Sequence, residues 1–76
     1  MKIKTVQTIL TAAKEKQQRI VIKMHNDNIT FSFAKGDTGE NDIIEYDSDT
    51  DVISVIGNSR NFYIESETIE CIKVYK

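Results

Sequence analysis

Near its N-terminus the chain has the hydrophobic spacing of a one-sided helix. Apolar residues recur there every three or four positions, at Val6, Ile9, Leu10 and Ala13. This spacing predicts an amphipathic α-helix from Thr5 to Gln17. Thr5 is expected to cap the helix, because a threonine hydroxyl can accept a hydrogen bond from a free amide of the first turn. A helix of this length is marginal alone, so we expect its apolar face to pack on the rest of the protein.

From Arg19 onward, apolar and polar residues alternate, which indicates β-strands. The segment "RIVIKMHNDNITFSF" predicts a hairpin with Asn26-Asp27 at its tip. This turn would place apolar side chains opposite one another on the same face, in the pairs Met24–Ile29, Ile22–Phe31 and Ile20–Phe33. The agreement between turn and pattern favours this register.

The second half of the chain predicts further strands joined by turns. "IIEY" and "VISVI" would form a hairpin with Ser48-Asp49 at its tip, which sets Ile44 opposite Ile53. A tip at Asn58-Ser59 would form the next hairpin, with the pairs Val55–Phe62 and Ile53–Ile64. "ESET" is expected to form one turn of 3₁₀ helix, and "IECIKVYK" the last strand.

The predicted fold is therefore α+β and mostly β, with one domain over residues 1–76. An N-terminal amphipathic helix would precede about five antiparallel strands. This order resembles that of the Sm-like and SH3-like small barrels, and the resemblance implies a partly closed barrel. The alternative is a five-stranded meander with the helix packed on one face.

The charge balance argues against a general nucleic-acid binder. The 76 residues include 10 basic and 12 acidic ones, for a net charge of −2, whereas such binders cluster Lys and Arg to neutralise phosphates. Sm-like proteins that bind RNA usually carry a basic step before the last strand, and here that region reads "YIESETIE". An Sm-like nucleic-acid-binding barrel remains the alternative function, through Lys2, Lys4, Lys14, Arg19, Lys23 and Lys73.

Several features predict a cytoplasmic protein without a membrane segment. The N-terminal stretch has neither the long apolar run nor the cleavage site of a signal peptide. Cys71 is the lone cysteine, as suits a reducing compartment. Abundant isoleucine, lysine and asparagine suggest an AT-rich bacterial or phage genome.

The stretch "DSDTD" resembles the start of a calcium-binding loop, with Asp47, Asp49 and Asp51 at alternate positions. An EF-hand loop also needs Gly at its sixth position and Glu at its twelfth, where this chain has Val52 and Asn58. We therefore interpret the stretch as a hairpin tip, because aspartate and serine favour turns. Weak cation binding by these three carboxylates is kept as an alternative.

No combination of residues in the sequence predicts catalysis. His25 is a lone histidine without an evident nucleophile or orienting acid, and no phosphate-binding or zinc-binding motif is present. We expect no enzymatic activity and no cofactor.

The sequence thus favours a small protein-interaction module, with a protein partner or a further copy of itself bound to exposed residues. A chain this short has a thin core and sheet edges that are hard to cover. The candidate partner-binding residues are Tyr63, Tyr75, Lys73 and His25.

Overall fold

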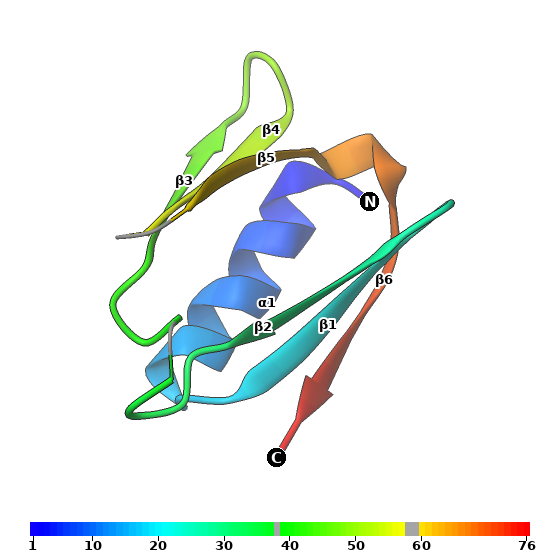
Figure 1. Ribbon diagram of the computed structural model, residues 1–76. Coiled ribbons are helices and arrows are strands. Elements are labelled where there is room, and N and C mark those ends of the chain that lie inside the picture. The colour runs from blue at the N-terminus through cyan, green and yellow to red at the C-terminus, as the bar shows by residue number, and fades with distance from the viewer. Residues whose placement is uncertain (38, 58–59) are drawn as a thin grey trace.

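The computed structural model describes residues 1–37, 39–57 and 60–76 of the chain. In these ranges one α-helix comes first and six strands follow, with a short 3₁₀ helix before the last strand (Figure 1). The bounds are α1 Ile3–Glu15, β1 Arg19–Met24, β2 Asn28–Ser32, β3 Ile43–Asp47, β4 Val52–Ile56, β5 Asn61–Glu65, η1 Ser66–Thr68 and β6 Ile69–Tyr75.

The strands form two three-stranded sheets. In one sheet β1 lies between β2 and β6, and in the other β4 lies between β3 and β5. Each strand is antiparallel to its neighbour. Over the described residues the strands form no closed barrel, because the hydrogen-bonded ladders of the two sheets are separate. The predicted α+β class, with a helix packed on antiparallel strands, is confirmed, with six strands instead of about five.

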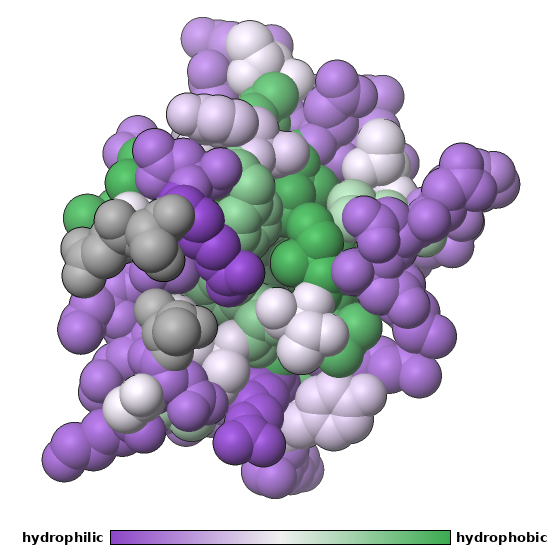
Figure 2. Space-filling model, in the orientation of Figure 1, coloured by the Kyte–Doolittle hydropathy of each residue, from purple (hydrophilic) through white to green (hydrophobic). Residues whose placement is uncertain are grey.

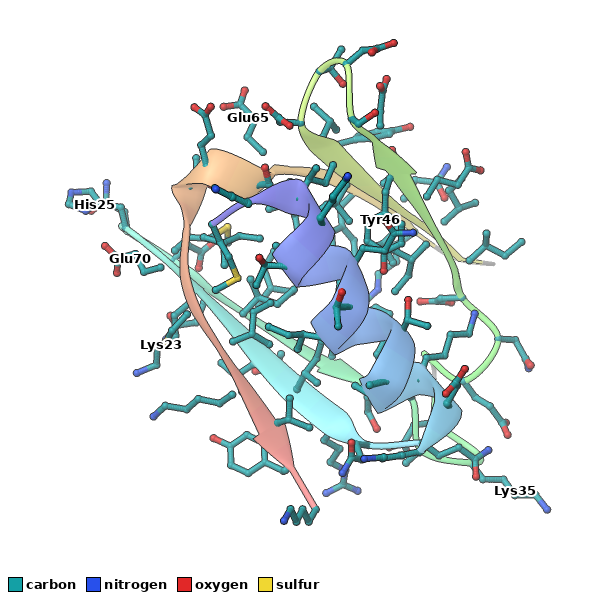
Figure 3. The ribbon with its side chains drawn as sticks, turned by 180° about the vertical axis from the view of Figure 1, so that it is seen from behind. Lys23, His25, Lys35, Tyr46, Glu65 and Glu70 are labelled. Atoms are coloured by element: carbon teal, nitrogen blue, oxygen red, sulfur yellow. The ribbon has the colours of Figure 1, made fainter. Side chains whose placement is uncertain are left out.

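The hydrophobic core lies where α1 meets the two sheets. Figure 1 shows α1 behind the strands, and the reverse view in Figure 3 shows it in front of them. The buried apolar residues come from α1, from both sheets and, at Phe33, from the residue just after β2: Ile3, Val6, Leu10, Ala13, Ile20, Ile22, Phe31, Phe33, Ile53, Val55, Ile64 and Ile69. Apolar side chains are visible in the middle of the face shown in Figure 2, with polar residues around them. Helix and sheets therefore stabilise one another through a shared core.

The helix begins two residues earlier than predicted. It starts at Ile3 with Lys2 as N-cap, and no side chain caps it, so the predicted cap at Thr5 is wrong. The burial of Ile3 explains the difference, because its side chain extends the apolar stripe by one turn and lies in the core.

The C-terminal end of α1 is closed by backbone hydrogen bonds. The amide of Gln18 donates to the carbonyl oxygen of Ala13 over 3.0 Å, and that of Gln17 donates to Lys14 over 3.1 Å. Gln17 has a φ of 53°, in the left-handed region. These bonds and this conformation are those of a Schellman motif, which ends the helix at Glu15 and turns the chain toward β1.

The first hairpin is shifted by two residues from the predicted register. The observed pairs include Ile22–Ile29 and Ile20–Phe31. The predicted tip at Asn26-Asp27 is wrong, because the carbonyl oxygen of Asp27 accepts the amide of Met24 over 2.8 Å. His25-Asn26 therefore forms the tip. A shift of two residues leaves every side chain on its predicted face, so the predicted apolar face is still the one that is buried.

The second hairpin is shifted in the same way. Ile44 pairs with Val55, so its predicted pairing with Ile53 is wrong. The loop spans residues 48–51 instead of the two predicted at its tip. Local hydrogen bonding explains the longer loop, because the Asp47 carboxylate accepts the amide of Asp49 over 2.9 Å.

The third hairpin and the end of the chain follow the prediction. Val55 pairs with Phe62 and Ile53 with Ile64, as expected. The predicted tip, residues 58–59, lies outside the described residues. The predicted 3₁₀ turn is observed as η1, and the last strand is β6, which pairs with β1.

Candidate interaction surfaces

The outer face of the β3–β4–β5 sheet combines carboxylates with apolar side chains. Because side chains alternate along a strand, the residues between the core positions point away from the core. In rows across the sheet they are Asp47–Val52–Glu65, Glu45–Ser54–Tyr63 and Ile43–Ile56–Asn61. These rows contain three acidic side chains and no basic one. We call this surface the acidic face.

Apolar groups on the acidic face are open to solvent. The residue Ile43 is 57% exposed and Tyr63 is 68% exposed. Ile43 also lies directly opposite Ile56, so the two isoleucines form a small apolar patch beside the carboxylates. Within the described ranges, no cationic side chain lies within 4.0 Å of the three carboxylates of this face.

The outer face of the β2–β1–β6 sheet has the opposite charge. Its rows are Ser32–Arg19–Tyr75, Thr30–Val21–Lys73 and Asn28–Lys23–Cys71. Three side chains in these rows are basic and none is acidic. We call this surface the basic face. At its edge, Nε of Arg19 lies 3.7 Å from a carboxylate oxygen of Asp37, which partly neutralises that corner.

The candidate partner-binding residues are divided between these surfaces. Tyr75 and Lys73 lie on neighbouring rows of the basic face. Tyr63 lies on the acidic face, on the other sheet. The structure therefore brings Tyr75 and Lys73 together and separates Tyr63 from both.

His25 belongs to neither face. It stands at the tip of the β1–β2 hairpin, and its Nδ1 lies 3.7 Å from a carboxylate oxygen of Glu70 at the start of β6. In Figure 3 both side chains project from the same end of the β2–β1–β6 sheet. Because both are exposed, this contact contributes little to stability, and the imidazole is not enclosed in a site.

The acidic stretch that resembles a calcium loop forms a turn. Asp47 uses its carboxylate to hold the amide of Asp49, and the carbonyl oxygen of Asp51 accepts the amide of Ser66 over 2.8 Å. Asp51 has a φ of 56°, as suits the end of a tight loop. Over the described residues, no group of three or more His, Cys, Asp or Glu side chains is placed to hold a metal ion.

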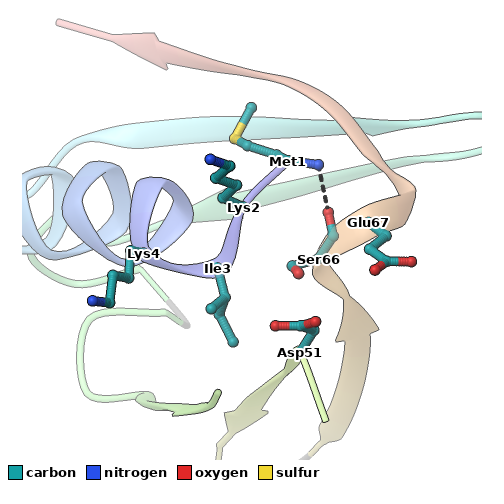
Figure 4. Close-up of a pocket in the computed structure, with 7 residues that line it drawn as sticks. All are labelled: Met1, Lys2, Ile3, Lys4, Asp51, Ser66 and Glu67. Carbon is teal, nitrogen blue, oxygen red and sulfur yellow. Dashed lines mark hydrogen bonds between the residues drawn. The ribbon is translucent and has the colours of Figure 1, made fainter. Parts of the chain in front are cut away.

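A pocket of about 580 Å³ lies between the start of α1 and the turn at η1 (Figure 4). It is lined by Met1, Lys2, Ile3, Lys4, Asp51, Ser66 and Glu67. The Met1 amine donates to the carbonyl oxygens of Ser66, over 2.9 Å, and Ile69, over 3.1 Å. These bonds join the first residues of the chain to the turn between β5 and β6. The lining combines lysines and carboxylates in one open pocket, so it has no strong preference for one sign of charge.

The pKa of the Tyr46 side chain is raised in the folded protein. Burial raises the pKa of the Tyr46 phenol above its ordinary value of 10.0, and a side-chain hydrogen bond with Thr11 offsets part of that rise. The tyrosine lines a pocket of about 370 Å³ with Leu10 and Ile44, between α1 and β3. Its role in this position is to pack the β3–β4–β5 sheet against the helix.

Comparison of the chain with protein-family models, with curated proteins and with solved structures gives no match. Within the described ranges, no helix has the length and apolar character that crossing a bilayer requires.

Sequence reasoning missed most of the acidic face. The sequence predicts Ile43 and Glu45 in a strand and Glu65 in the 3₁₀ turn, and it gives none of the three a role on the surface, whereas Glu65 ends β5. The signal was present in "IIEYD" and "VISVI", because strands with adjacent isoleucines or with apolar residues on both faces must expose some of them. Which strands share an outer face depends on the sheet order, and that order became visible only in the structure.

Proposed function

We propose that the protein is a non-enzymatic interaction module that associates with further copies of itself through its exposed sheet faces. The observation that supports this proposal is the opposite charge of the acidic face and the basic face on one small chain. A surface that carries only one sign of charge attracts a surface of the other sign and repels its own kind. Each copy of this protein offers both.

Solvent-exposed apolar groups on these surfaces support the same proposal. On the acidic face Tyr63 and Ile43 stand beside the carboxylates, and on the basic face Tyr75 is 50% exposed beside lysines. Tyrosine is favoured at protein interfaces because it combines an apolar ring with a polar hydroxyl group. An apolar patch bordered by charges is typical of a protein-binding surface.

The size of the faces predicts weak association. A face of three strands, each about 4.8 Å apart and five residues long, covers roughly 200–300 Å². A standard interface buries roughly 800 Å² on each partner. We therefore expect reversible association, with a Kd between about 10 μM and about 1 mM.

Light scattering coupled to size exclusion tests this proposal over a range of protein concentrations around that Kd. The mean mass should rise with concentration at low salt. The variant Tyr63→Ser should reduce the rise, whereas Gln7→Ala, which changes an exposed residue of α1, should leave it unchanged. A mass that stays at the monomer value across the series would overturn the proposal.

Nucleic-acid binding is the second candidate function, and one observation favours it. The basic face places Lys23, Lys73 and Arg19 on one sheet surface with Tyr75, and such a surface suits a phosphate backbone with a stacked base. Labelled single-stranded RNA or DNA should then shift at low salt and be released as salt is raised. The absence of a shift at low salt would exclude this candidate.

We also propose that the protein is located in the cytoplasm of a bacterial or phage-infected cell. This location is supported by the lone Cys71, which is suited to a reducing compartment, and by the residue usage. Fractionation of cells that express the tagged protein tests the location, and recovery in the secreted or membrane fraction would contradict it.

A further inference from the structure

We infer that copies of this protein assemble head to tail, with the acidic face of one copy docked on the basic face of the next. This inference rests on the proposed self-association and adds its direction and its contact residues. The occupant of each face is therefore a second copy of this chain.

The position of the two faces in the molecule determines the kind of assembly. Each face lies on the outside of its sheet, and the core lies between the sheets, so the faces look away from each other (Figure 1). A symmetric dimer that used one face twice would bring like charges together. In another symmetric dimer, the acidic face of each copy would contact the basic face of the other. That dimer would need the acidic face and the basic face on the same side of the molecule. Head-to-tail contact satisfies the charges and leaves a free face at each end, so it extends to further copies.

The lysines of the basic face are the groups most available for this contact. Over the described residues, Lys23 and Lys73 have no carboxylate within 4.0 Å, whereas Arg19 already contacts Asp37. In Figure 3 the Lys23 side chain extends away from the sheet, on its outer side. A lysine has a long flexible stem, so it can reach a carboxylate on a facing sheet without a fixed geometry.

The acidic face offers matching partners around an apolar contact. Glu45 and Glu65 lie on its two edge strands, on β3 and β5, and both are exposed. Tyr63 lies in the same row as Glu45, with Ser54 of β4 between the two. Docking would bring these carboxylates to the lysines and cover Tyr63 with the apolar centre of the basic face, at Val21. Because the charged pairs lie at the rim, salt should weaken the assembly.

Paired charge reversal tests the direction of assembly. One variant carries Lys23→Glu and Lys73→Glu, and therefore has two acidic faces. The other carries Glu45→Lys and Glu65→Lys, and therefore has two basic faces. Each variant alone should associate at least about tenfold more weakly than the natural chain, because all its faces then repel one another. An equimolar mixture of the two variants should recover association, measured as mean mass by light scattering.

A matched control separates the faces from net charge. Lys4→Glu with Lys35→Glu makes the same change in net charge as the variant with Lys23→Glu and Lys73→Glu, but on α1 and on the loop after β2. This control should leave association as it is in the natural chain. Circular dichroism of each variant verifies that it is folded, and an unfolded variant is replaced by its single substitutions.

The outcomes distinguish the two proposals. If the natural chain is a monomer throughout, the proposed function fails and this inference fails with it. If the natural chain associates but the reversed variants associate equally well, or their mixture shows no recovery, the head-to-tail arrangement is overturned and self-association stands. Loss of RNA binding in the lysine variant, with unchanged self-association, would instead assign the basic face to nucleic acid.

Discussion

The ring of Phe31, on one sheet, lies 6.1 Å from the ring of Phe62, on the other, with the ring planes at 70°. This edge-to-face contact is one of the places where the two sheets meet directly. The guanidinium group of Arg60 lies over both rings, 5.7 Å from the centre of Phe31 and 5.3 Å from that of Phe62. The separate ladders of the two sheets are thus joined by aromatic packing as well as by the helix.

A double-mutant cycle between these phenylalanines should show that the sheets stabilise each other. Phe31→Leu and Phe62→Leu should each lower the free energy of unfolding by about 1–3 kcal/mol. Because each ring also loses its aromatic partner, the coupling between the two changes should be about 0.5–1.5 kcal/mol. Urea denaturation of the four proteins measures it. Effects that add to within about 0.3 kcal/mol would show that the rings do not interact.

The end of α1 offers a stabilising substitution. Gln17 has a φ of 53°, a conformation that glycine adopts without steric cost. Gln17→Gly should therefore raise the free energy of unfolding by about 0.5–1 kcal/mol. The control is Gln18→Gly at the next residue, which does not have a positive φ and should lose stability. If both variants shift the urea midpoint in the same direction, the left-handed cap is not the cause.

The hydrophobic pattern predicts which side of each strand is buried, but not how the strands slide along each other. Two predicted hairpins are wrong by two residues in register, yet Ile20 and Ile22 are buried as the alternation requires. A slip of two residues keeps every side chain on its face, so the pattern cannot detect it. The register is decided by the turns, in which Asp27 and Asp47 accept hydrogen bonds from nearby amides.

For the candidate surface residues, the sequence predicts exposure but not which residues share a face. Tyr63 and Tyr75 were both predicted as exposed partner-binding residues, and both are exposed. Their separation onto faces of opposite charge could not be predicted, because it depends on β6 leaving β5 through η1 and pairing with β1. Tertiary packing determines which strands pair when they are distant in the sequence. The alternation of apolar and polar residues within one strand does not contain that information.

Gly39 is required by a close approach of two backbone segments. A Cβ atom at this position would overlap the carbonyl oxygen of Ser32 and press against the ring of Phe31. Gly39→Ala should therefore lower the free energy of unfolding by about 1–3 kcal/mol, since either the loop or β2 must move. Lys35→Ala changes an exposed residue of the same loop and should stay within about 0.5 kcal/mol of the natural chain. Equal stability of the two variants in urea would contradict this close packing.

Tyr46 predicts a loss of stability at alkaline pH. Burial raises the pKa of its phenol in the folded protein above the ordinary value of 10.0, and the hydrogen bond with Thr11 only partly offsets that rise. The folded chain therefore keeps this proton at a pH where the unfolded chain releases it. Below the ordinary pKa the group has no effect on the pH dependence. As the pH rises from there through the folded pKa, stability falls, because ionisation favours the unfolded chain.

Tyr46→Phe isolates this effect, because phenylalanine fills the same space and does not titrate. Urea denaturation of both proteins at about pH 8 and about pH 11 gives the loss of stability between the two conditions. The natural chain should lose more than the variant, while lysines and the other tyrosines contribute equally to both. The difference in absorbance between the two proteins near the phenolate band during a pH titration reports the ionisation of Tyr46 directly. An equal loss of stability in both proteins would show that the phenol ionises as easily in the folded chain as in the unfolded one.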